Sequence, residues 1–363
     1  MKKFWKNKNV LITGVTGFIG GNLTKKIVEH GANVFGLVRN NNPKSFLFYE
    51  KIDKQIRIIS GGLDDVEALY SIITEERIEV IFHLAAQVEV GVGLTNPFLT
   101  FETNVRGTYN LMEACRRAKN SGHEIQSIIV ASSDKAYGEY SIEQMPYRET
   151  YPLLPKYPYD TSKACADLIC QAYSIDQYKL PVVITRFSNI YGPGQMNFSA
   201  IIPDAIRSAS GYSTFIPRSD GSMVRDFIFV EDVATLYMKI SEHLSQTPDL
   251  LRGEIFNAGT DSPISMKEVI IKVFDLMGNQ TEKERILHDM AGKKTTGEIN
   301  YQHMAFDKVY SYFKWKPVHE MDEGLKKTIN WFKMYFENNG SEIAVVLGRP
   351  SEERGWKSHS KNG

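Results

Sequence analysis

The sequence predicts an α/β protein, with a doubly wound parallel sheet in the first half of the chain and a smaller α/β domain towards the C-terminus. Short, continuous apolar runs alternate with helical patterns as far as Phe187, as expected for parallel strands that are buried on both faces. After Phe187 the rhythm changes, and loops rich in Gly, Pro and Ser separate shorter elements. Such a change indicates a second architecture built onto the first.

The strands of the first half are expected in a regular order. A buried strand at Asn9–Thr13 precedes an amphipathic helix over residues 17–30, and a second strand follows at Asn33–Val38. The remaining strands are expected over residues 56–60, 80–84, 127–132 and 182–187, with helices between them. A strand-like run over residues 225–230 then leads into a helix that opens at Glu231.

A glycine loop joins the first strand to the first helix. It reads Thr13-Gly-Val-Thr-Gly17-Phe-Ile-Gly20. Gly14 permits a tight turn, Gly17 lets the backbone approach a pyrophosphate, and Gly20 lets the helix pack closely on the sheet. Because a strand precedes the loop and a helix follows it, the sequence predicts a Rossmann-type dinucleotide site.

The domain boundaries follow from these elements. We expect a dinucleotide-binding domain over residues 1–188, with a return segment near 225–258, and a substrate-binding domain over residues 189–224 and 259–336. Residues 337–363 are mostly polar and are expected to form a largely disordered tail.

Composition excludes several classes of function. Lys plus Arg and Asp plus Glu both number 43 in 363 residues, so no basic excess points to nucleic acid. No apolar run is long enough for a membrane span or a signal-peptide core. The three cysteines fit no disulfide framework, and no spacing suggests a metal site. A cytoplasmic protein without metal, membrane or nucleic-acid partners is expected.

The chain resembles the extended branch of the short-chain dehydrogenase/reductase superfamily, of the NAD-dependent epimerase/dehydratase type. The resemblance runs from about Asn9 to at least Phe256. One departure concerns the cofactor, because Gly61-Gly62-Leu63 stands where the family usually has Gly-Asp-Leu or Gly-Asp-Ile. Besides the glycine loop, the resemblance rests on His83-Leu-Ala-Ala-Gln87, Asn104-Val-x-Gly-Thr, Tyr159-x-x-x-Lys163, Arg186-x-x-Asn189-x-Tyr-Gly-Pro193 and Arg225-Asp-Phe-x-x-Val-x-Asp232.

The resemblance implies a tightly bound NAD(P) that is regenerated in each cycle. The second strand ends in Arg39-Asn40 with no acidic residue, which favours NADP modestly over NAD. The alternative is that Arg39 is a solvated loop residue. The implied cofactor contacts are Gly14, Thr16, Gly17, Phe18, Ile19, Gly20, Arg39, Leu63, Leu84, Ala85, Ala86, Asn104, Tyr159 and Lys163.

The resemblance also implies the roles of the catalytic residues. Tyr159 removes the proton from a sugar hydroxyl, and Ser133 hydrogen-bonds that hydroxyl. Lys163 lies one helical turn from Tyr159, so its ammonium is expected to lower the pKa of Tyr159 and to hold the nicotinamide ribose. Asp134 and Lys135 follow Ser133 and resemble the Asp-Lys variants of CDP-glucose 4,6-dehydratases and some UDP-N-acetylglucosamine 4,6-dehydratases.

These residues predict a lyase, a nucleotide-sugar 4,6-dehydratase that makes a 4-keto-6-deoxyhexose. Asp134 serves as the acid at C6 and Lys135 as the base at C5. If the two form only a structural ion pair, a nucleotide-sugar 4-epimerase or a simple reductase remains. A catalytically silent dinucleotide-binding regulator is a further alternative, and the presence of Ser133, Tyr159 and Lys163 together argues against it.

A nucleotide-diphosphate hexose is the expected substrate, and a homodimer the expected assembly. Gln87, Asn189 and Arg225 are predicted to bind the substrate, since a guanidinium fits phosphate oxygens. In relatives, the helices matching residues 98–119 and 159–177 form a four-helix dimer interface. CDP-glucose is the first expectation because of Asp134-Lys135, although Asn189-Ile-Tyr-Gly-Pro-Gly194 fits the general family pattern better.

Overall fold

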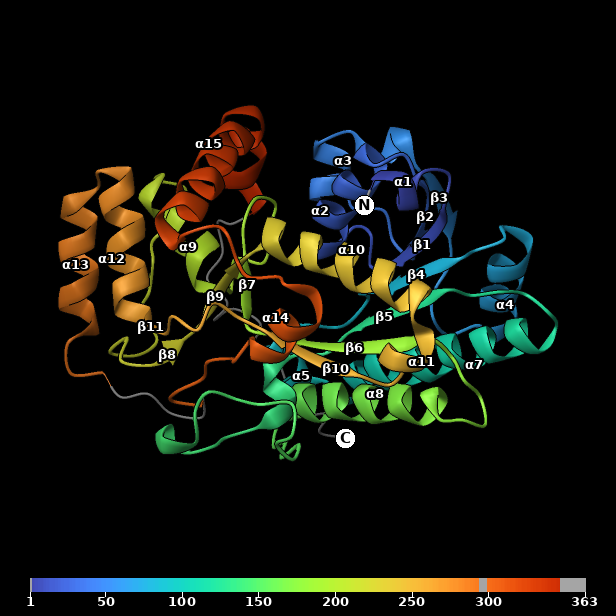
Figure 1. Ribbon diagram of the computed structural model, residues 1–363. Coiled ribbons are helices and arrows are strands. Elements are labelled where there is room, and N and C mark those ends of the chain that lie inside the picture. Colours follow the sequence, from blue (N-terminus) through green and yellow to red (C-terminus); the bar gives the residue numbers. More distant parts are fainter. Residues whose placement is uncertain (1, 294–298, 347–363) are drawn as a thin grey trace, which may run out of the picture.

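A seven-stranded parallel sheet forms the centre of the computed structural model, which describes residues 2–293 and 299–346. The strand order is β10-β6-β5-β4-β1-β2-β3, and every neighbouring pair is parallel. The predicted doubly wound sheet is therefore confirmed (Figure 1). Its strands are β1 Asn9–Thr13, β2 Asn33–Val38, β3 Arg57–Ser60, β4 Val80–His83, β5 Ser127–Ala131, β6 Val182–Phe187 and β10 Ile255–Ala258.

Helices cover both faces of this sheet, and each face has its own apolar core. On one face, residues such as Leu23, Phe82 and Tyr237 pack together with almost no exposure to solvent. On the other, residues such as Leu69 and Cys115 do the same. The first face carries α2 Phe18–Glu29 and α10 Val230–Gln246, and the second carries α4 Val66–Glu75, α7 Gly107–Asn120 and α8 Pro158–Ser174 (Figure 1).

Short elements connect these layers. The helix predicted over residues 98–119 is built from α6, a π-helical segment (Glu102–Arg106) and α7 in direct succession. The short helices are α1 Lys2–Trp5, α3 Phe46–Tyr49, α5 Val90–Thr95, α6 Pro97–Phe101 and α11 Pro248–Leu251, and the 3-10 turns are η1 Ile52–Gln55, η3 Asp134–Tyr137 and η4 Ile142–Gln144.

The single strand predicted over residues 225–230 is divided in two. Val224–Arg225 (β8) pairs antiparallel with Ile264–Ser265 (β11), whereas Phe227–Phe229 (β9) pairs with Asn189–Tyr191 (β7). Asp226 stands at the break: its backbone carbonyl accepts from Asn189 N, and its fully buried carboxylate accepts bonds from the backbone and side chain of Thr260. The two parts of the predicted strand therefore belong to two small sheets beside the central one.

Except for α14 (Asp307–Phe313), which lies against β10, the C-terminal helices lie around these small sheets at the left of Figure 1. The predicted tail begins as helix, because α15 continues to Val346; residues 347–363 lie outside the described residues. The predicted return segment supplies β10, while the domain boundaries themselves stay a prediction. The helices are α9 Ile201–Ala209, α12 Met266–Met277, α13 Gln280–Met290, α14 Asp307–Phe313 and α15 Met321–Val346.

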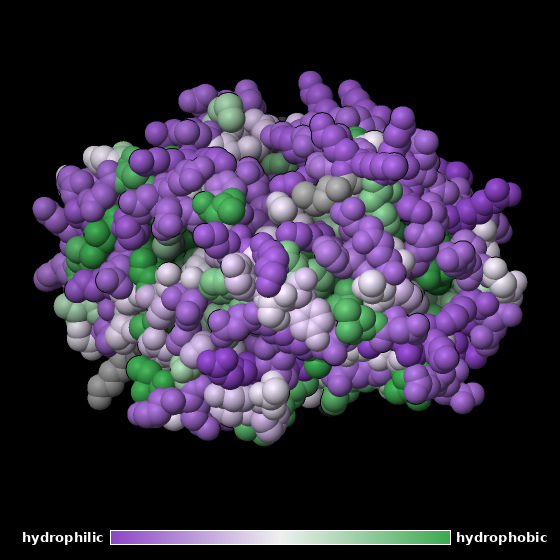
Figure 2. All heavy atoms as spheres, viewed as in Figure 1, coloured by the Kyte–Doolittle hydropathy of each residue, from purple (hydrophilic) through white to green (hydrophobic). Residues whose placement is uncertain are grey.

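The outer surface is mainly hydrophilic in the view of Figure 2, with hydrophobic side chains in separate areas. In the described part of the chain, no helix is both long and apolar enough to cross a membrane.

Candidate active site

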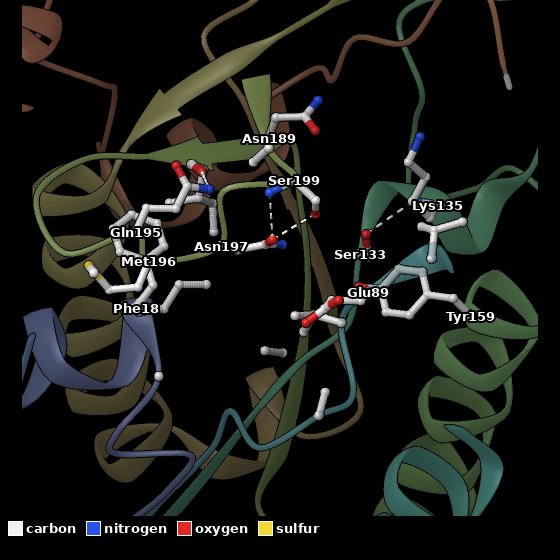
Figure 3. A pocket seen from close by; sticks show the side chains of 18 of the residues that line it. Phe18, Glu89, Ser133, Lys135, Tyr159, Asn189, Gln195, Met196, Asn197 and Ser199 are labelled. Atoms are coloured by element: carbon white, nitrogen blue, oxygen red, sulfur yellow. Dashed lines mark hydrogen bonds between the residues drawn. The ribbon is translucent and has the colours of Figure 1, made fainter. Parts of the chain in front are cut away.

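A large cavity lies where the loops that follow β1, β4, β5 and β6 meet the C-terminal region. Its volume is about 1380 Å³. Pockets that hold one drug-sized ligand are typically about 300–1,000 Å³, so this cavity has room for two molecules side by side. Figure 3 shows Phe18 and Met196 on one side of it, and Ser133 and Tyr159 on the other.

The glycine loop forms one wall of the cavity, as predicted. Gly14 has a φ of +73°, and a Cβ at this position would lie 2.7 Å from the backbone N of Ala85. A Cβ on Gly20 would overlap the carbonyl oxygen of Gly14. The loop therefore needs glycine at both positions. The other predicted cofactor residues that line the cavity are Thr16, Gly17, Phe18, Ile19, Arg39, Leu63, Leu84, Ala85, Ala86 and Tyr159.

Arg39 and Ser45 are two further polar residues of the lining. Arg39 is exposed and lines the cavity. Ser45 lines it too, is 3% exposed, and its hydroxyl has no partner among the described residues. A buried hydroxyl without a partner is costly, and a ligand oxygen would relieve that cost.

Asn104 and Gln87 bond to each other, and their predicted contacts with cofactor and substrate stay predictions. Neither belongs to the lining of the cavity. Asn104 accepts a bond from the Gln87 backbone N (2.7 Å) and donates to the Gln87 carbonyl (3.0 Å) and to Ser162 Oγ (2.8 Å). The Gln87 side chain is held by Thr100 and by the carbonyl of Glu89. The polar groups of both residues form hydrogen bonds within the protein, and these bonds hold the loop over residues 84–89 in place.

The turn with the predicted catalytic residues Ser133, Asp134 and Lys135, here called the catalytic turn, follows β5 directly. Ser133 caps the 3-10 turn η3, its Oγ accepting from the Lys135 backbone N at 3.2 Å and donating to Asp134 Oδ1 at 2.9 Å. Asp134 is 4% exposed, and Lys135 is half-buried. Lys135 Nζ donates to Gln302 Oε1 at 2.6 Å. The two neighbouring side chains thus have different hydrogen-bond partners, and all three residues of the turn line the cavity.

Helix α8 brings Tyr159 to the same place. Burial raises the pKa of Tyr159, the nearby Asp134 carboxylate adds to this, and a hydrogen bond from Ser133 opposes it. The predicted lowering of this pKa by Lys163 is not the dominant effect. Lys163 lies behind the cavity lining, its Nζ donates to the Ala131 carbonyl at 2.8 Å, and burial lowers its own pKa to about 8.

Two acidic residues close to Ser133 and Tyr159 were not predicted. Asp160 follows Tyr159 in the motif, is 3% exposed and lines the cavity. Burial raises its pKa to about 6, with Lys135 lowering it and Asp134 raising it. Glu89 also lines the cavity and lies beside Ser133 and Tyr159 in Figure 3. The sequence signal that could have identified them is the same in both cases: an acidic residue lies inside or beside a recognised motif.

Strands β7 and β8 carry the predicted substrate residues Asn189 and Arg225. Both line the cavity, and Arg225 is 5% exposed, with its Nη1 2.8 Å from the Val224 carbonyl. The sequence context of Arg218 favoured a charge that only contacts solvent. The residue is exposed and also lines the cavity. Asn197 and Ser199 join them through a tight turn, with Asn197 Oδ1 accepting from Ser199 N at 3.0 Å (Figure 3). Among the described residues no His, Cys, Asp and Glu cluster could hold a metal ion.

Comparison with known proteins agrees with this geometry. The family model for GDP-mannose 4,6 dehydratase matches residues 11–328, which is most of the chain. The protein belongs to this family. It is an α/β enzyme of the NAD-dependent epimerase/dehydratase type, as the sequence motifs predicted.

Similar proteins include several sugar-nucleotide dehydratases. The dTDP-D-glucose 4,6-dehydratase of Homo sapiens is 29% identical over 338 residues, covering 91% of each chain. The CDP-glucose 4,6-dehydratase of Salmonella typhimurium is 26% identical over 358 residues, covering 96% of each. The structure of dTDP-glucose 4,6-dehydratase from Bacillus anthracis in complex with NAD is 26% identical, with a TM-score of 0.75 over 91% of this chain and 98% of that one.

Proposed function

We propose that the protein is a nucleotide-sugar 4,6-dehydratase that converts a nucleotide-diphosphate hexose into the 4-keto-6-deoxy sugar and water. The observation that supports this most directly is the joint presence of Asp134, Lys135 and Tyr159 in one cavity with the glycine loop. A simple oxidoreductase needs Tyr159 and the cofactor only. An additional carboxyl and amine at the same position supply the acid and base for loss of water.

The residues present fit a nicotinamide dinucleotide. Gly14 and Gly20 leave open the space that side chains would fill, and the Gly17 end of α2 has no side-chain cap on its backbone N–H groups. A bound dinucleotide would supply the hydride chemistry, in which the hydride from C4 of the sugar is returned to C6. Arg39 and the unpaired hydroxyl of Ser45 support the modest preference for NADP, whose 2′-phosphate they would contact.

Oxidation at C4 is assigned to Tyr159 and Ser133. Tyr159, as the phenolate, takes the proton of the C4 hydroxyl, and Ser133 hydrogen-bonds the same oxygen. Since burial raises the pKa of Tyr159, its deprotonated form is stabilised only when a positive charge is close. Lys163, one turn away and buried, is the cation that can supply it.

Elimination of water is assigned to Lys135 and Asp134. The new C4 ketone acidifies C5, and the neutral amine of Lys135 removes the C5 proton. Asp134 in its acid form gives a proton to the departing C6 hydroxyl, which leaves as water. The Asp134 side chain is almost fully buried, lines the cavity and lies next to Ser133 in the same turn.

Arg225 and Asn189 line the same cavity as the glycine loop, and we propose that they contact the diphosphate. The relatives named above are dTDP-D-glucose and CDP-glucose 4,6-dehydratases, so nucleotides with either base are candidates.

The purified protein, with NAD or NADP added, is tested against CDP-, GDP-, UDP- and dTDP-hexoses, and the products are weighed by mass spectrometry. Loss of one water supports the dehydratase. An unchanged mass with a new stereoisomer supports a 4-epimerase and contradicts the proposal. Cofactor binding without turnover of any sugar supports a silent regulator. Dissociation constants for NAD and NADP test the cofactor preference separately.

We also propose a homodimer in the cytoplasm. Apolar side chains are exposed on α6 and α8, including Phe98 (73% exposed) and Leu168 (57%). Neighbouring exposed apolar residues mark association surfaces in soluble proteins. The three cysteines are free, which supports a reducing compartment.

A further inference from the structure

Gln302 reaches the catalytic turn from a distant part of the chain. Its Oε1 lies 2.6 Å from Lys135 Nζ, although the two residues are 167 positions apart in the sequence. Gln302 is 1% exposed, and nothing in the sequence around it suggested a role in the site. The contact joins the amine assigned as the base to an uncharged amide.

The orientation of the Gln302 amide is determined by Tyr147. The phenol of Tyr147 donates its proton to the Gly138 carbonyl at 2.5 Å, so its oxygen can only accept from other groups. Gln302 Nε2 lies 3.4 Å from that oxygen and is its donor. Burial raises the pKa of Tyr147, which keeps it a phenol. The carbonyl end of Gln302 must therefore face Lys135.

The segment that carries Gln302 is held on both sides. The Gln302 backbone N donates to the Val224 carbonyl at 3.1 Å, next to Arg225. On the other side, Tyr147 N donates to the His303 carbonyl at 3.0 Å. Gly138, which accepts from Tyr147, ends the catalytic turn. These bonds form a closed circuit from Lys135 through Gln302 and Tyr147 back to the turn that bears Lys135.

An amide and a carboxylate differ in their effect on the protonation state of a neighbouring lysine. A carbonyl accepts an N–H from an amine as well as from an ammonium, so it orients Lys135 in either protonation state. A carboxylate at this distance would strongly favour the ammonium. A neutral amine that gives one N–H to Gln302 keeps its lone pair for another direction.

We infer that Gln302 is a positioning residue for Lys135, aiming the amine at the C5 hydrogen of the sugar through a carbonyl that does not require the lysine to be charged. The inference rests on the proposed function, since it assigns a partner to the proposed base. Gln302 acts through Lys135 and forms no bond with the reacting atoms.

The decisive variant is Gln302→Glu, which keeps the shape and adds a negative charge. We expect C5 deuterium exchange and dehydration near neutral pH to fall about 10-fold or more, and to recover at higher pH. The rising limb of the pH–rate profile should move up by about 1–2 pH units, because an adjacent opposite charge stabilises the ammonium. Formation of the reduced dinucleotide in a single turnover, which reports C4 oxidation, should change less than about twofold.

Two further variants separate positioning from folding. Gln302→Met keeps the volume and removes the acceptor, so kcat should fall about 10–100-fold with KM little changed and no recovery at high pH. Gln177→Glu adds the same charge at an exposed position near the far end of α8 and should keep the profile of the parent protein. Thermal melts of all variants verify that each one is folded.

The outcomes distinguish this inference from the proposed function. If the parent protein releases no water from any sugar, the proposed function fails. If the parent dehydrates its substrate and folded Gln302→Glu shows the same pH–rate profile, the positioning role is wrong. A uniform loss in Gln302→Glu at every pH also contradicts it, since a purely structural defect is not relieved by deprotonating Lys135.

Discussion

At the scale of single residues, neighbours in the sequence have different environments in space. Asp134 is almost fully buried beside Ser133, whereas Lys135 reaches out to Gln302. Their different hydrogen-bond partners favour separate acid and base roles over a purely structural pair. Asp160 is a second buried carboxyl, and the charges of Asp134 and Lys135 both affect its pKa.

Replacing Lys135 with Ala should separate the two halves of the reaction. General base catalysis contributes about 10²–10⁴-fold, so C5 deuterium exchange and water loss should fall by that factor. Oxidation at C4 should continue, because Tyr159 and Ser133 remain. The measurement is proton exchange at C5 by NMR beside single-turnover reduction of the cofactor. Lys316→Ala, at an exposed position, is the control. Undiminished dehydration in Lys135→Ala would show that another group is the base.

The stability of the protein should depend on pH through Asp160. Its pKa is about 6 in the folded protein against an ordinary value of 3.8, so the folded form binds more protons between these values. The stabilisation is fully present below about pH 4 and is lost as the pH rises through about 6. Asp160→Asn should therefore raise the free energy of unfolding by about 1–3 kcal/mol at about pH 7.5 and by little near pH 4. Urea unfolding at both pH values measures this, and an equal effect at the two would contradict it.

At the scale of elements, α8 carries several of the side chains that we propose for the reaction. Its first turns carry Tyr159, Asp160 and Lys163, and the next carries Asp167. Asp167 accepts two bonds from Arg186 of β6, at 2.7 and 3.1 Å, in a pair that is 3% exposed or less. This pair ties the helix to the sheet close to the catalytic turn, because the Arg186 guanidinium also lies 4.7 Å from the ring of Tyr137.

Breaking this pair should destabilise the fold strongly. Asp167→Asn removes the charge that compensates the buried Arg186, and such losses cost about 3–5 kcal/mol. The matched control is Glu76→Gln, which removes the exposed Arg57–Glu76 pair of similar length (2.6 Å) and should cost under about 1 kcal/mol. Denaturant unfolding compares the two variants. Equal costs would mean that α8 is not held by this pair.

At the scale of the whole molecule, the two halves of the chain are interleaved. Strand β10 comes from the second half and completes the central sheet, while Gln302 reaches the catalytic turn of the first half. The exposed apolar residues of α6 and α8 lie on the covering layer of that sheet. One further copy of this surface would bury them in a symmetric contact.

The double variant Phe98→Asp and Leu168→Asp should turn the proposed dimer into a monomer, because two charges would be buried in an apolar contact. Light scattering after size exclusion gives the mass, and a melt verifies the fold. Val318→Asp, at an exposed position near α15, controls for loss of surface hydrophobicity. A parent protein that is already monomeric would contradict the dimer.

The sequence by itself determined the sheet, the cofactor loop and the motif residues, since each depends on local patterns. β1, β2 and β6 have the predicted bounds because continuous apolar runs and their flanking turns are local signals. Only the tertiary structure decided that Asn104 and Gln87 brace a loop, that Asp226 divides a strand, and that Gln302 meets Lys135. Those outcomes depend on pairs of groups brought together from distant positions, where burial requires each polar atom to find a partner that no local pattern specifies.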